Sequence, residues 1–251
     1  MDLDYVAVDV NRIHLYFLTQ APTYEEFRKL WDRKNRQTSY KLLEQRFSGD
    51  ERDWGRIRRA WKVAHRGWND VPERLRELRY MIRNFQLSTF ANNPEDYAYV
   101  RTMALEGRII AVPGDLNGAV TMKGIASRAR QMEIPIRVVY MSNAEEYMRF
   151  PPNMRENIRA LPVDQRSIVI RTATTGAKYV LGYPDGEKFP DKFPFHYNVQ
   201  PVLVFQEWMN YSEKFKLLDM LRHNRKLQKG LSIQEKTPAD LGLSVRAAGV
   251  Q

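Results

Sequence analysis

Two hydrophobic periods alternate along the chain, so the pattern predicts both strands and helices. The stretch DYVAVDVN (4–11) is a short apolar run with β-branched residues that ends in an acid and an amide, which predicts a buried strand and its exit turn. The period then changes. In APTYEEFRKLWDR, Thr23 stands three residues before Glu26, which is the spacing of a capping box. A helix is therefore expected to begin at Thr23.

A long helical stripe occupies the region 54–85. Its apolar residues recur at steps of three and four, and they are Trp54, Ile57, Trp61, Ala64, Trp68, Val71, Leu75, Leu78, Ile82 and Phe85. Pro72 follows Asn69 and Asp70 and fits the first turn of a new helix, so the stripe predicts two helices with their arginines outward. A further helix is expected in NNPEDYAYVRTMALEGR, closed by Gly107.

Strands and helices alternate after residue 107. The expected order is a strand in RIIAVPGDLNG (108–118), a helix in TMKGIASRARQMEI (121–134), a strand in PIRVVYMSN (135–143), a helix in PPNMRENIRAL (151–161) and a strand in SIVIRTAT (167–174). Strands separated by helices at this spacing predict crossovers and a parallel sheet. The expected fold class is therefore α/β.

The signal is weaker in the last third of the chain. KYVLGY (178–183) and NVQPVLVFQEW (198–208) predict an antiparallel edge, and a basic helix is expected from about residue 212 to 229, before a loose tail. These elements suggest an α/β domain over residues 1–200, with a helical insertion at about 23–106. The remainder, 201–251, would form a C-terminal helix and tail.

The composition narrows the classes of function. The chain has 251 residues, 43% of them hydrophobic, and no run approaches the roughly 18 apolar residues of a membrane helix, so a soluble protein without membrane contacts is expected. The N-terminus lacks a signal-peptide pattern and there is no cysteine, which favours a cytoplasmic location. The missing thiols exclude thiol catalysis and Cys-based zinc sites. With only four scattered histidines, no metal site is expected.

The net charge of +10 is concentrated in one segment. Residues Arg28 to Arg83 carry 17 basic and 8 acidic side chains, whereas the rest of the chain carries 23 and 22. Such a segment predicts contacts with nucleic-acid phosphates, and it equally fits an ordinary solvated helix face.

Polar residues stand at three expected strand ends. Asp9 and Asn11 close the first strand, Gly114, Asp115 and Asn117 the second, and Ser142, Asn143 and Glu145 the third. Ligands of an open parallel sheet bind outside the carboxyl ends of its strands. The apolar run is therefore expected to break at Ser142 because the chain enters a ligand crevice.

Each of these residues also has a structural explanation. Asp9 fits an N-cap, GDLNG fits a plain turn, and the pair Glu145 and Glu146 fits a helix N-terminus capped by Ser142 or Asn143. His196, in FPFHYNVQ, fits a packed neighbour of aromatic rings better than a base. The tryptophans of the stripe fit a core.

Five stretches carry a resemblance to a known family. They are VDVNRIHLYFL, EGRIIAVPGDLNG, IPIRVVYMSNAEEYM, MRENIRALPVDQRSIVIRT and FHYNVQ, and they resemble an uncharacterised bacterial family similar to class I methyltransferases that use S-adenosylmethionine. The resemblance runs in register from about Val6 to Gln200, and YMSNAEEY and ALPVDQRSIVIRT are its more specific parts. It implies an open, mostly parallel, Rossmann-like sheet with helices on both faces.

The resemblance also implies roles for individual residues. The residues that it assigns to S-adenosylmethionine are Asp9, Asn11, Gly114, Asp115 and Leu116. Asp9 would bind the ribose hydroxyls, and Asp115 would accept a hydrogen bond from the adenine amino group. Ser142, Asn143 and Glu145 would lie near the transferred methyl group as the candidates for catalysis.

Members of that family carry a further strand and a glycine turn before the VDVN-like stretch, and this sequence shows neither, so we expect an incomplete cofactor site. The first hypothesis is a methyltransferase-like protein, whose methyl acceptor the sequence does not identify. The second is a nucleic-acid-binding module that uses the segment Arg28–Arg83. The third is a non-catalytic interaction protein that retains the fold.

Overall fold

The protein divides into two compact units, residues 1–113 and 114–251, in the computed structural model. The structure describes residues 3–66, 70–86, 88–174, 195–228 and 231–243. The boundary near residue 113 differs from the expected division at residue 200. The helices of the 23–106 region share a hydrophobic core with the N-terminal segment and so form a unit of their own.

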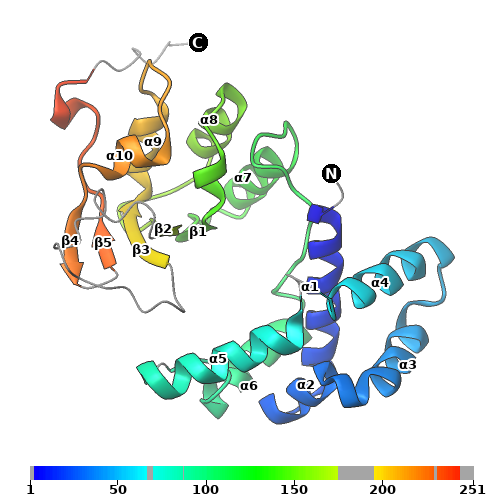
Figure 1. The fold of residues 1–251 in the computed structure, drawn as a ribbon. Helices are drawn as coiled ribbons and strands as arrows, with labels where there is room; N and C mark the ends of the chain where they lie inside the picture. Colours follow the sequence, from blue (N-terminus) through cyan, green and yellow to red (C-terminus); the bar gives the residue numbers. More distant parts are fainter. Residues whose placement is uncertain (1–2, 67–69, 87, 175–194, 229–230, 244–251) are drawn as a thin grey trace. The chain divides into compact units, whose positions relative to one another are not determined.

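The described part of the first unit is helical, and we call it the helical unit. Its elements are α1 (Leu3–Gln20), α2 (Tyr24–Trp31), the 3-10 helix η1 (Arg33–Asn35), α3 (Arg36–Phe47), α4 (Glu51–Val63), α5 (Val71–Phe85) and α6 (Pro94–Leu105). Helix α1 packs against α2, α4 and α6, and α2 packs against α3 and α5 (Figure 1). The core lies around α1.

The expected strand at residues 4–11 is wrong, because these residues belong to α1. The helical period becomes visible only over the whole element, where Asp9, Ile13 and Phe17 are buried at steps of four. An eight-residue apolar run cannot distinguish a buried strand from one end of a helix.

The helix signals after residue 20 are confirmed. Thr23 and Glu26 form the expected capping box, in which Glu26 N donates to Thr23 Oγ1 and Thr23 N donates to Glu26 Oε2. Pro72 lies in the first turn of α5, and Gly107 adopts a left-handed φ of +65° after α6. The stripe residues of α4 are buried in the core. Trp68 lies outside the described residues.

The second unit is a mixed α/β structure, and we call it the α/β unit. Its helices are α7 (Thr121–Gln131), α8 (Pro152–Arg159), α9 (Val202–Met209), α10 (Leu217–Leu221) and the 3-10 helices η3 (Ala144–Tyr147) and η5 (Ala239–Leu241). Its strands are β1 (Val138–Ser142), β2 (Ile168–Thr174), β3 (Phe195–Pro201), β4 (Arg225–Gln228) and β5 (Leu231–Ile233). The expected helices α7 and α8 and strands β1 and β2 are confirmed.

The five strands form one open sheet in the order β1-β2-β3-β5-β4. The pairs β1/β2 and β3/β5 are parallel, and β2/β3 and β4/β5 are antiparallel, so the sheet is mixed. The expected strand at 108–113 is wrong, because Ile110 and Val112 lie exposed in an irregular connection. An apolar run of four residues before Pro113 does not separate a strand from such a connection. Strand β1 is therefore at an edge.

The last third of the chain differs most from expectation. Strand β3 does pair antiparallel with β2, but it lies in the middle of the sheet, and the residues after Pro201 form α9. The long basic helix is wrong, because the region contains α10, of five residues, and the strand β4. The run 178–183 lies outside the described residues. Part of the expected tail is ordered, because Trp208 Nε1 donates to Lys236 O and η5 follows.

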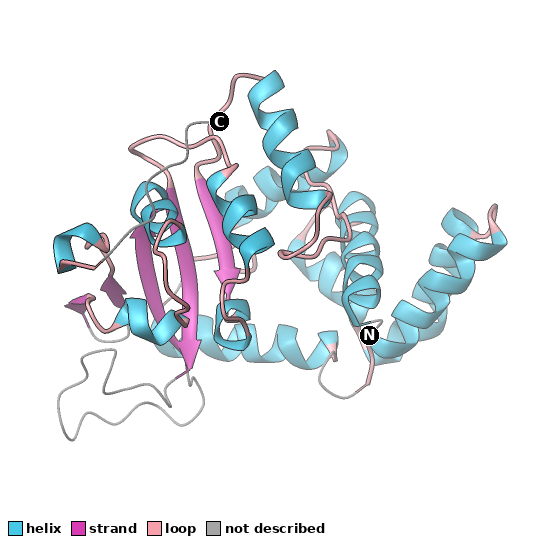
Figure 2. Cartoon of the chain, turned by 90° about the horizontal axis from the view of Figure 1, so that it is seen from above, coloured by secondary structure: helices cyan, strands magenta, loops and turns pink. Residues whose placement is uncertain are grey.

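One face of the sheet is covered by helices. Met141, Val169 and Ala173 belong to a core cluster with residues of α7, α8, α9 and α10. Figure 1 shows α8, α9 and α10 on the same side of the strands, and Figure 2 shows helices in front of the strands from above. Helices on both faces were expected, but this core is built on one face.

Candidate functional site

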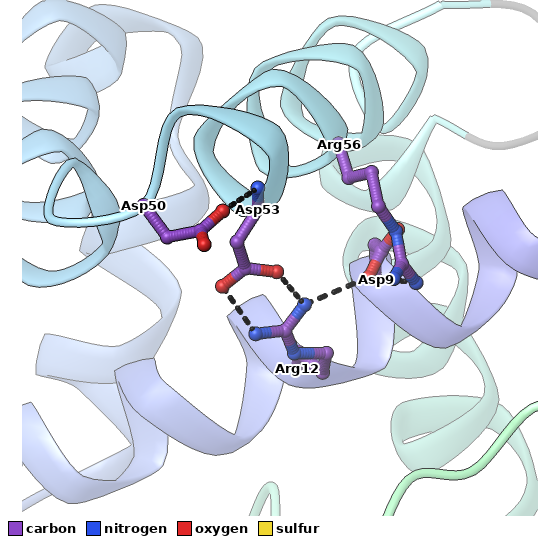
Figure 3. Close-up of polar contacts among 5 residues, drawn as sticks. All are labelled: Asp9, Arg12, Asp50, Asp53 and Arg56. Carbon is purple, nitrogen blue, oxygen red and sulfur yellow. Dashed lines mark hydrogen bonds and ion pairs between the residues drawn. The ribbon is translucent and has the colours of Figure 1, made fainter.

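Asp9 lies in the middle of α1 and joins it to α4. Its Oδ1 accepts hydrogen bonds from Arg12 Nη1 at 3.1 Å and Arg56 Nη2 at 3.0 Å, and its Oδ2 accepts from Arg56 Nε at 3.0 Å. Arg12 also binds both carboxylate oxygens of Asp53, at 2.7 and 2.8 Å (Figure 3). Asp50 caps α4 by accepting from Asp53 N. The side chains of Asp9, Arg12, Asp53 and Arg56 thus form one ion-pair cluster.

This cluster changes the interpretation of Asp9 and Asn11. The hydrogen bond from Arg12 lowers the pKa of Asp53, and the bond from Asp53 raises the pKa of Arg12. The carboxylate of Asp9 is 3% exposed and already binds two guanidinium groups, so it neither caps a helix nor faces a ligand at a strand end. Asn11 lies exposed on α1. Both residues belong to the helical unit, whereas the other candidates belong to the α/β unit.

The GDLNG stretch forms a turn before α7. Asn117 N donates to Asp115 Oδ1 at 2.8 Å, and Gly118 N donates to Asp115 O at 2.9 Å, which is the arrangement of an Asx turn. Asn157 of α8 holds the turn, because its Nδ2 donates to Leu116 O and Gly118 O at 2.9 and 2.8 Å. Gly114 leaves room for Thr121, because a Cβ at position 114 would lie only 2.8 Å from Thr121 Cγ2. The side chain of Asp115 is exposed. These hydrogen bonds are those of a plain turn, which was the structural explanation of this stretch.

The chain turns at Ser142, the last residue of β1. This residue is exposed and has φ +51°, a left-handed conformation, and the β1/β2 register shifts between Tyr140 and Ser142. Asn143 precedes η3 without a capping hydrogen bond from its side chain. The bulge and the left-handed residue turn the chain so that the next carboxylate, Glu145, enters the core.

Glu145 forms a buried ion pair with Arg171 of β2. Arg171 Nε donates to Glu145 Oε2 at 2.6 Å, and both side chains are 0% exposed. The guanidinium also lies over the Phe205 ring, 5.1 Å from its centroid. Among the described atoms, Glu145 Oε1 and Arg171 Nη2 have no hydrogen-bond partner. Glu145 therefore faces the core and not a solvent-filled crevice.

The buried polar contacts continue across the sheet to β5. Arg171 Nη1 donates to Asn198 Oδ1 at 2.9 Å, Asn198 Nδ2 donates to Ser232 Oγ at 2.9 Å, and Ser232 Oγ lies 2.7 Å from His196 Nε2. Burial lowers the pKa of His196 to about 4, with a smaller effect from Lys226. We call Glu145, Arg171, Asn198, Ser232 and His196 the buried network.

The buried network unites the stretches that carry the resemblance. Glu145 belongs to YMSNAEEY, Arg171 to ALPVDQRSIVIRT, and His196 and Asn198 to FHYNVQ. Sequence reasoning did not select Arg171, Asn198 or Ser232. A signal was present in FHYNVQ, where polar residues alternate with Tyr197 and Val199, because such a strand turns its polar side chains to one face. The network is closed to solvent. Its hydrogen bonds join the segment after Ser142 to strands β2, β3 and β5, so its role is to hold these parts together.

Positively charged side chains surround two neighbouring hollows on the surface of the helical unit. The larger, of 580 Å³, is lined by Arg33, Lys34, Arg36, Gln37, Tyr40, Arg58, Trp61, Lys62 and Arg66. The smaller, of 250 Å³, is lined by Arg28, Trp31, Asp32, Arg33, Lys34, Pro72, Leu75, Arg76 and Arg79. We call the nine arginines and lysines of these two sets the basic strip. It continues from one hollow to the next because both share Arg33 and Lys34.

Few carboxylates line the two hollows of the basic strip. Among the described residues, none lines the larger hollow, and Asp32 alone lines the smaller one, where its Oδ1 caps Lys34 N at 2.9 Å. Four cations of the strip are paired with carboxylates that lie outside the two linings: Arg33 with Asp70, Arg58 with Glu51 at 3.0 Å, Arg28 with Glu25 at 3.3 Å and Arg76 with Glu73. Trp31 and Trp61 are at most 2% exposed, so they form the floor of the strip and their rings are not available for stacking.

Comparison with known proteins shows the family of the chain but not its activity. The model of a family described as a domain of unknown function, DUF7790, matches residues 1–237, and the chain belongs to that family. No curated protein matches the sequence. In the described part of the chain, no helix is long and apolar enough to span a bilayer.

Proposed function

We propose that the helical unit binds the phosphate groups of a nucleic acid through the basic strip. The observation that carries this proposal is the larger hollow, which six arginines and lysines line and which no described carboxylate lines. A concave surface with one sign of charge attracts polyanions and orients them. Guanidinium groups match the geometry of phosphate oxygens, and four of these six cations are arginines.

The strip supplies charge and no base recognition. Its tryptophans are buried beneath the cations, so contacts are made with the phosphate backbone. Binding is therefore expected to depend steeply on salt and weakly on sequence, because each neutralised phosphate releases counterions.

The test is a salt titration of binding to labelled duplex DNA. The variant Arg36→Gln/Lys62→Gln removes one cation from each wall of the larger hollow, since Arg36 belongs to α3 and Lys62 to α4. Each lost contact is expected to reduce the slope of log K against log salt by about 0.9. The matched control is Lys41→Gln/Arg46→Gln, which removes the same charge from exposed positions of α3 outside both hollows. Equal slopes for the two double variants would contradict the proposal.

Methyl transfer from S-adenosylmethionine is a second proposal, and it concerns the α/β unit. It is favoured by the strand-helix-strand order β1-α8-β2 with parallel strands, which is one element of a Rossmann-like sheet. Asp115 and Ser142 are exposed, and their neighbours Leu116 and Met141 pack in the same hydrophobic cluster. The exposed Asp115 is the candidate for the cofactor's adenine, and the acceptor is not identified by this geometry.

This second proposal is tested by a thermal shift with S-adenosylmethionine. A ligand that binds the native state raises the melting temperature. Asp115→Ala is expected to reduce that rise, whereas Asp9→Ala is expected to lower the melting temperature of the free protein and leave the rise unchanged. No rise with the wild-type chain would eliminate this proposal without affecting the first.

A further inference from the structure

The sheet has a second face that lies outside the core of its own unit. Side chains alternate along strands, and the residues opposite in parity to Met141, Val169 and Arg171 share this face. They are Val138 and Tyr140 of β1, Ile168, Ile170 and Thr172 of β2, Tyr197 and Val199 of β3, and Leu231 and Ile233 of β5. We call these nine residues the open face. As far as the described residues extend, the core cluster of the α/β unit includes none of them.

The open face is apolar and accessible. Tyr140 is 60% exposed, Val138 53% and Tyr197 47%, while the isoleucines are half-buried and Thr172 is buried. None of the nine side chains is charged. Contiguous exposed apolar surface commonly marks a binding site. An occupant of this face is therefore expected.

Two tyrosines project from the open face at a short distance from each other. Tyr140 pairs with Ile170, and Tyr197 pairs with Thr172, two residues further along β2. Strand spacing places their Cα atoms roughly 12 Å apart. Burial raises the pKa of Tyr197, and Tyr140 adds to the rise, so the two phenol groups share one environment. Together they form a platform with two aromatic rings and half-buried aliphatic side chains around them.

The charge of the α/β unit favours a polyanion over a second copy of the chain. Residues 114–251 contain 20 lysines and arginines against 14 aspartates and glutamates. Face-to-face association of two copies would oppose two units with the same excess of positive charge. Aromatic rings on a sheet of a basic unit match the requirements of unpaired bases joined by phosphates.

We propose that the open face binds single-stranded nucleic acid, with bases stacked on Tyr140 and Tyr197. The inference rests on the proposed function of the basic strip, and it specifies the class of nucleic acid. The strip contacts phosphates alone and does not distinguish single strands from duplexes. The tyrosine platform adds stacking, which only unpaired bases can provide.

The test compares affinities for an oligothymidine of about 12 nucleotides and for a duplex of the same length. Tyr140→Val and Tyr197→Val remove a ring from a strand and keep a side chain that favours strands. Each is expected to weaken oligothymidine binding by about fivefold to 150-fold, the equivalent of one stacked base, and to leave duplex binding unchanged. Tyr147→Leu is the control, because Tyr147 is 79% exposed but belongs to η3, which contacts α10. Circular dichroism melts verify that each variant is folded.

The outcomes separate the two proposals. Loss of single-strand affinity in both strand variants, with duplex affinity retained, supports the platform. Wild-type affinity for oligothymidine in both variants overturns it, and the basic strip then stands on its own salt titration. If sedimentation shows a dimer that the same variants dissociate, the face contacts a second copy and the inference is wrong. If the wild-type chain binds neither DNA, both proposals fail.

Discussion

Arg171 Nε donates a 2.6 Å hydrogen bond to Glu145 Oε2, and neither side chain is exposed. The pair joins the segment after β1 to the middle of β2, and Asn198 extends it into β3. Each charge of a buried ion pair is stabilised by the other, so removal of one partner leaves an uncompensated charge in the core. The pair therefore holds the turn after Ser142 against strand β2.

We expect Arg171→Met to lower the free energy of unfolding by about 3 to 5 kcal/mol, because it leaves the carboxylate of Glu145 buried without its partner. The double variant Glu145→Leu/Arg171→Met removes both charges and is expected to recover most of that loss. Urea unfolding measures both. The exposed pair of Arg137 and Asp164 is the control, and Arg137→Ala is expected to cost about 1 kcal/mol or less. A single variant as stable as the double variant would contradict a coupled pair.

Ser142 is expected to respond to substitution according to backbone conformation. At φ +51°, Ser142→Gly is expected to be neutral or to stabilise slightly, whereas Ser142→Val is expected to cost about 1 to 3 kcal/mol. The measurement is the melting temperature of each variant. Because Ser142 is exposed, a loss of buried contacts cannot explain the difference. Equal destabilisation by glycine and valine would contradict a conformational cause.

The stability of the α/β unit is expected to fall as the pH falls from about 6.5 to about 4. The pKa of His196 is lowered to about 4 by burial, so over this range the unfolded chain binds a proton that the folded chain excludes. In His196→Gln the loss of stability between pH 7 and pH 5 is expected to be smaller by about 1 to 2 kcal/mol. Urea unfolding at the two pH values tests this. His14, whose pKa burial also lowers to about 4, provides the same comparison in the helical unit.

Asp9→Asn is expected to destabilise the helical unit by about 1.5 to 3 kcal/mol, because Arg12 and Arg56 lose a charged acceptor between α1 and α4. Thermal unfolding measures the loss. Asp50→Ser is the control, since serine can still cap α4 at that position, and its effect is expected to be small. A variant at Asp9 as stable as the wild type would show that the ion-pair cluster contributes nothing.

Local signals predicted a large part of the fold. The capping box at Thr23, Pro72 in the first turn of α5 and the parallel pair β1/β2 follow from neighbouring residues, and all are confirmed. The strand proposed at 4–11 failed because a short apolar run fits two periods. Strands β4 and β5 have four and three residues, too few to show any period.

The candidate site was less predictable than the fold. The segment Arg28–Arg83 and the turn at Ser142 were selected from the sequence, but the partner of Glu145 lies 26 residues away on another strand. Tyr140 and Tyr197 lie on the same face of the sheet because the strand order is β1-β2-β3. No local pattern in the sequence encodes this order. Contacts across strands arise from topology, whereas caps and turns arise from neighbouring residues.

Strand β5 lies between β3 and β4, although it follows both of them in the sequence. On the ribosome, β3 therefore has an unpaired edge until residue 233 has emerged, whereas the described helices of the helical unit all end by residue 105. Domains commonly fold as they emerge, and an unpaired strand edge is a route to aggregation. We expect the nascent chain to carry a folded helical unit while the sheet depends on chaperones until β5 has left the ribosome.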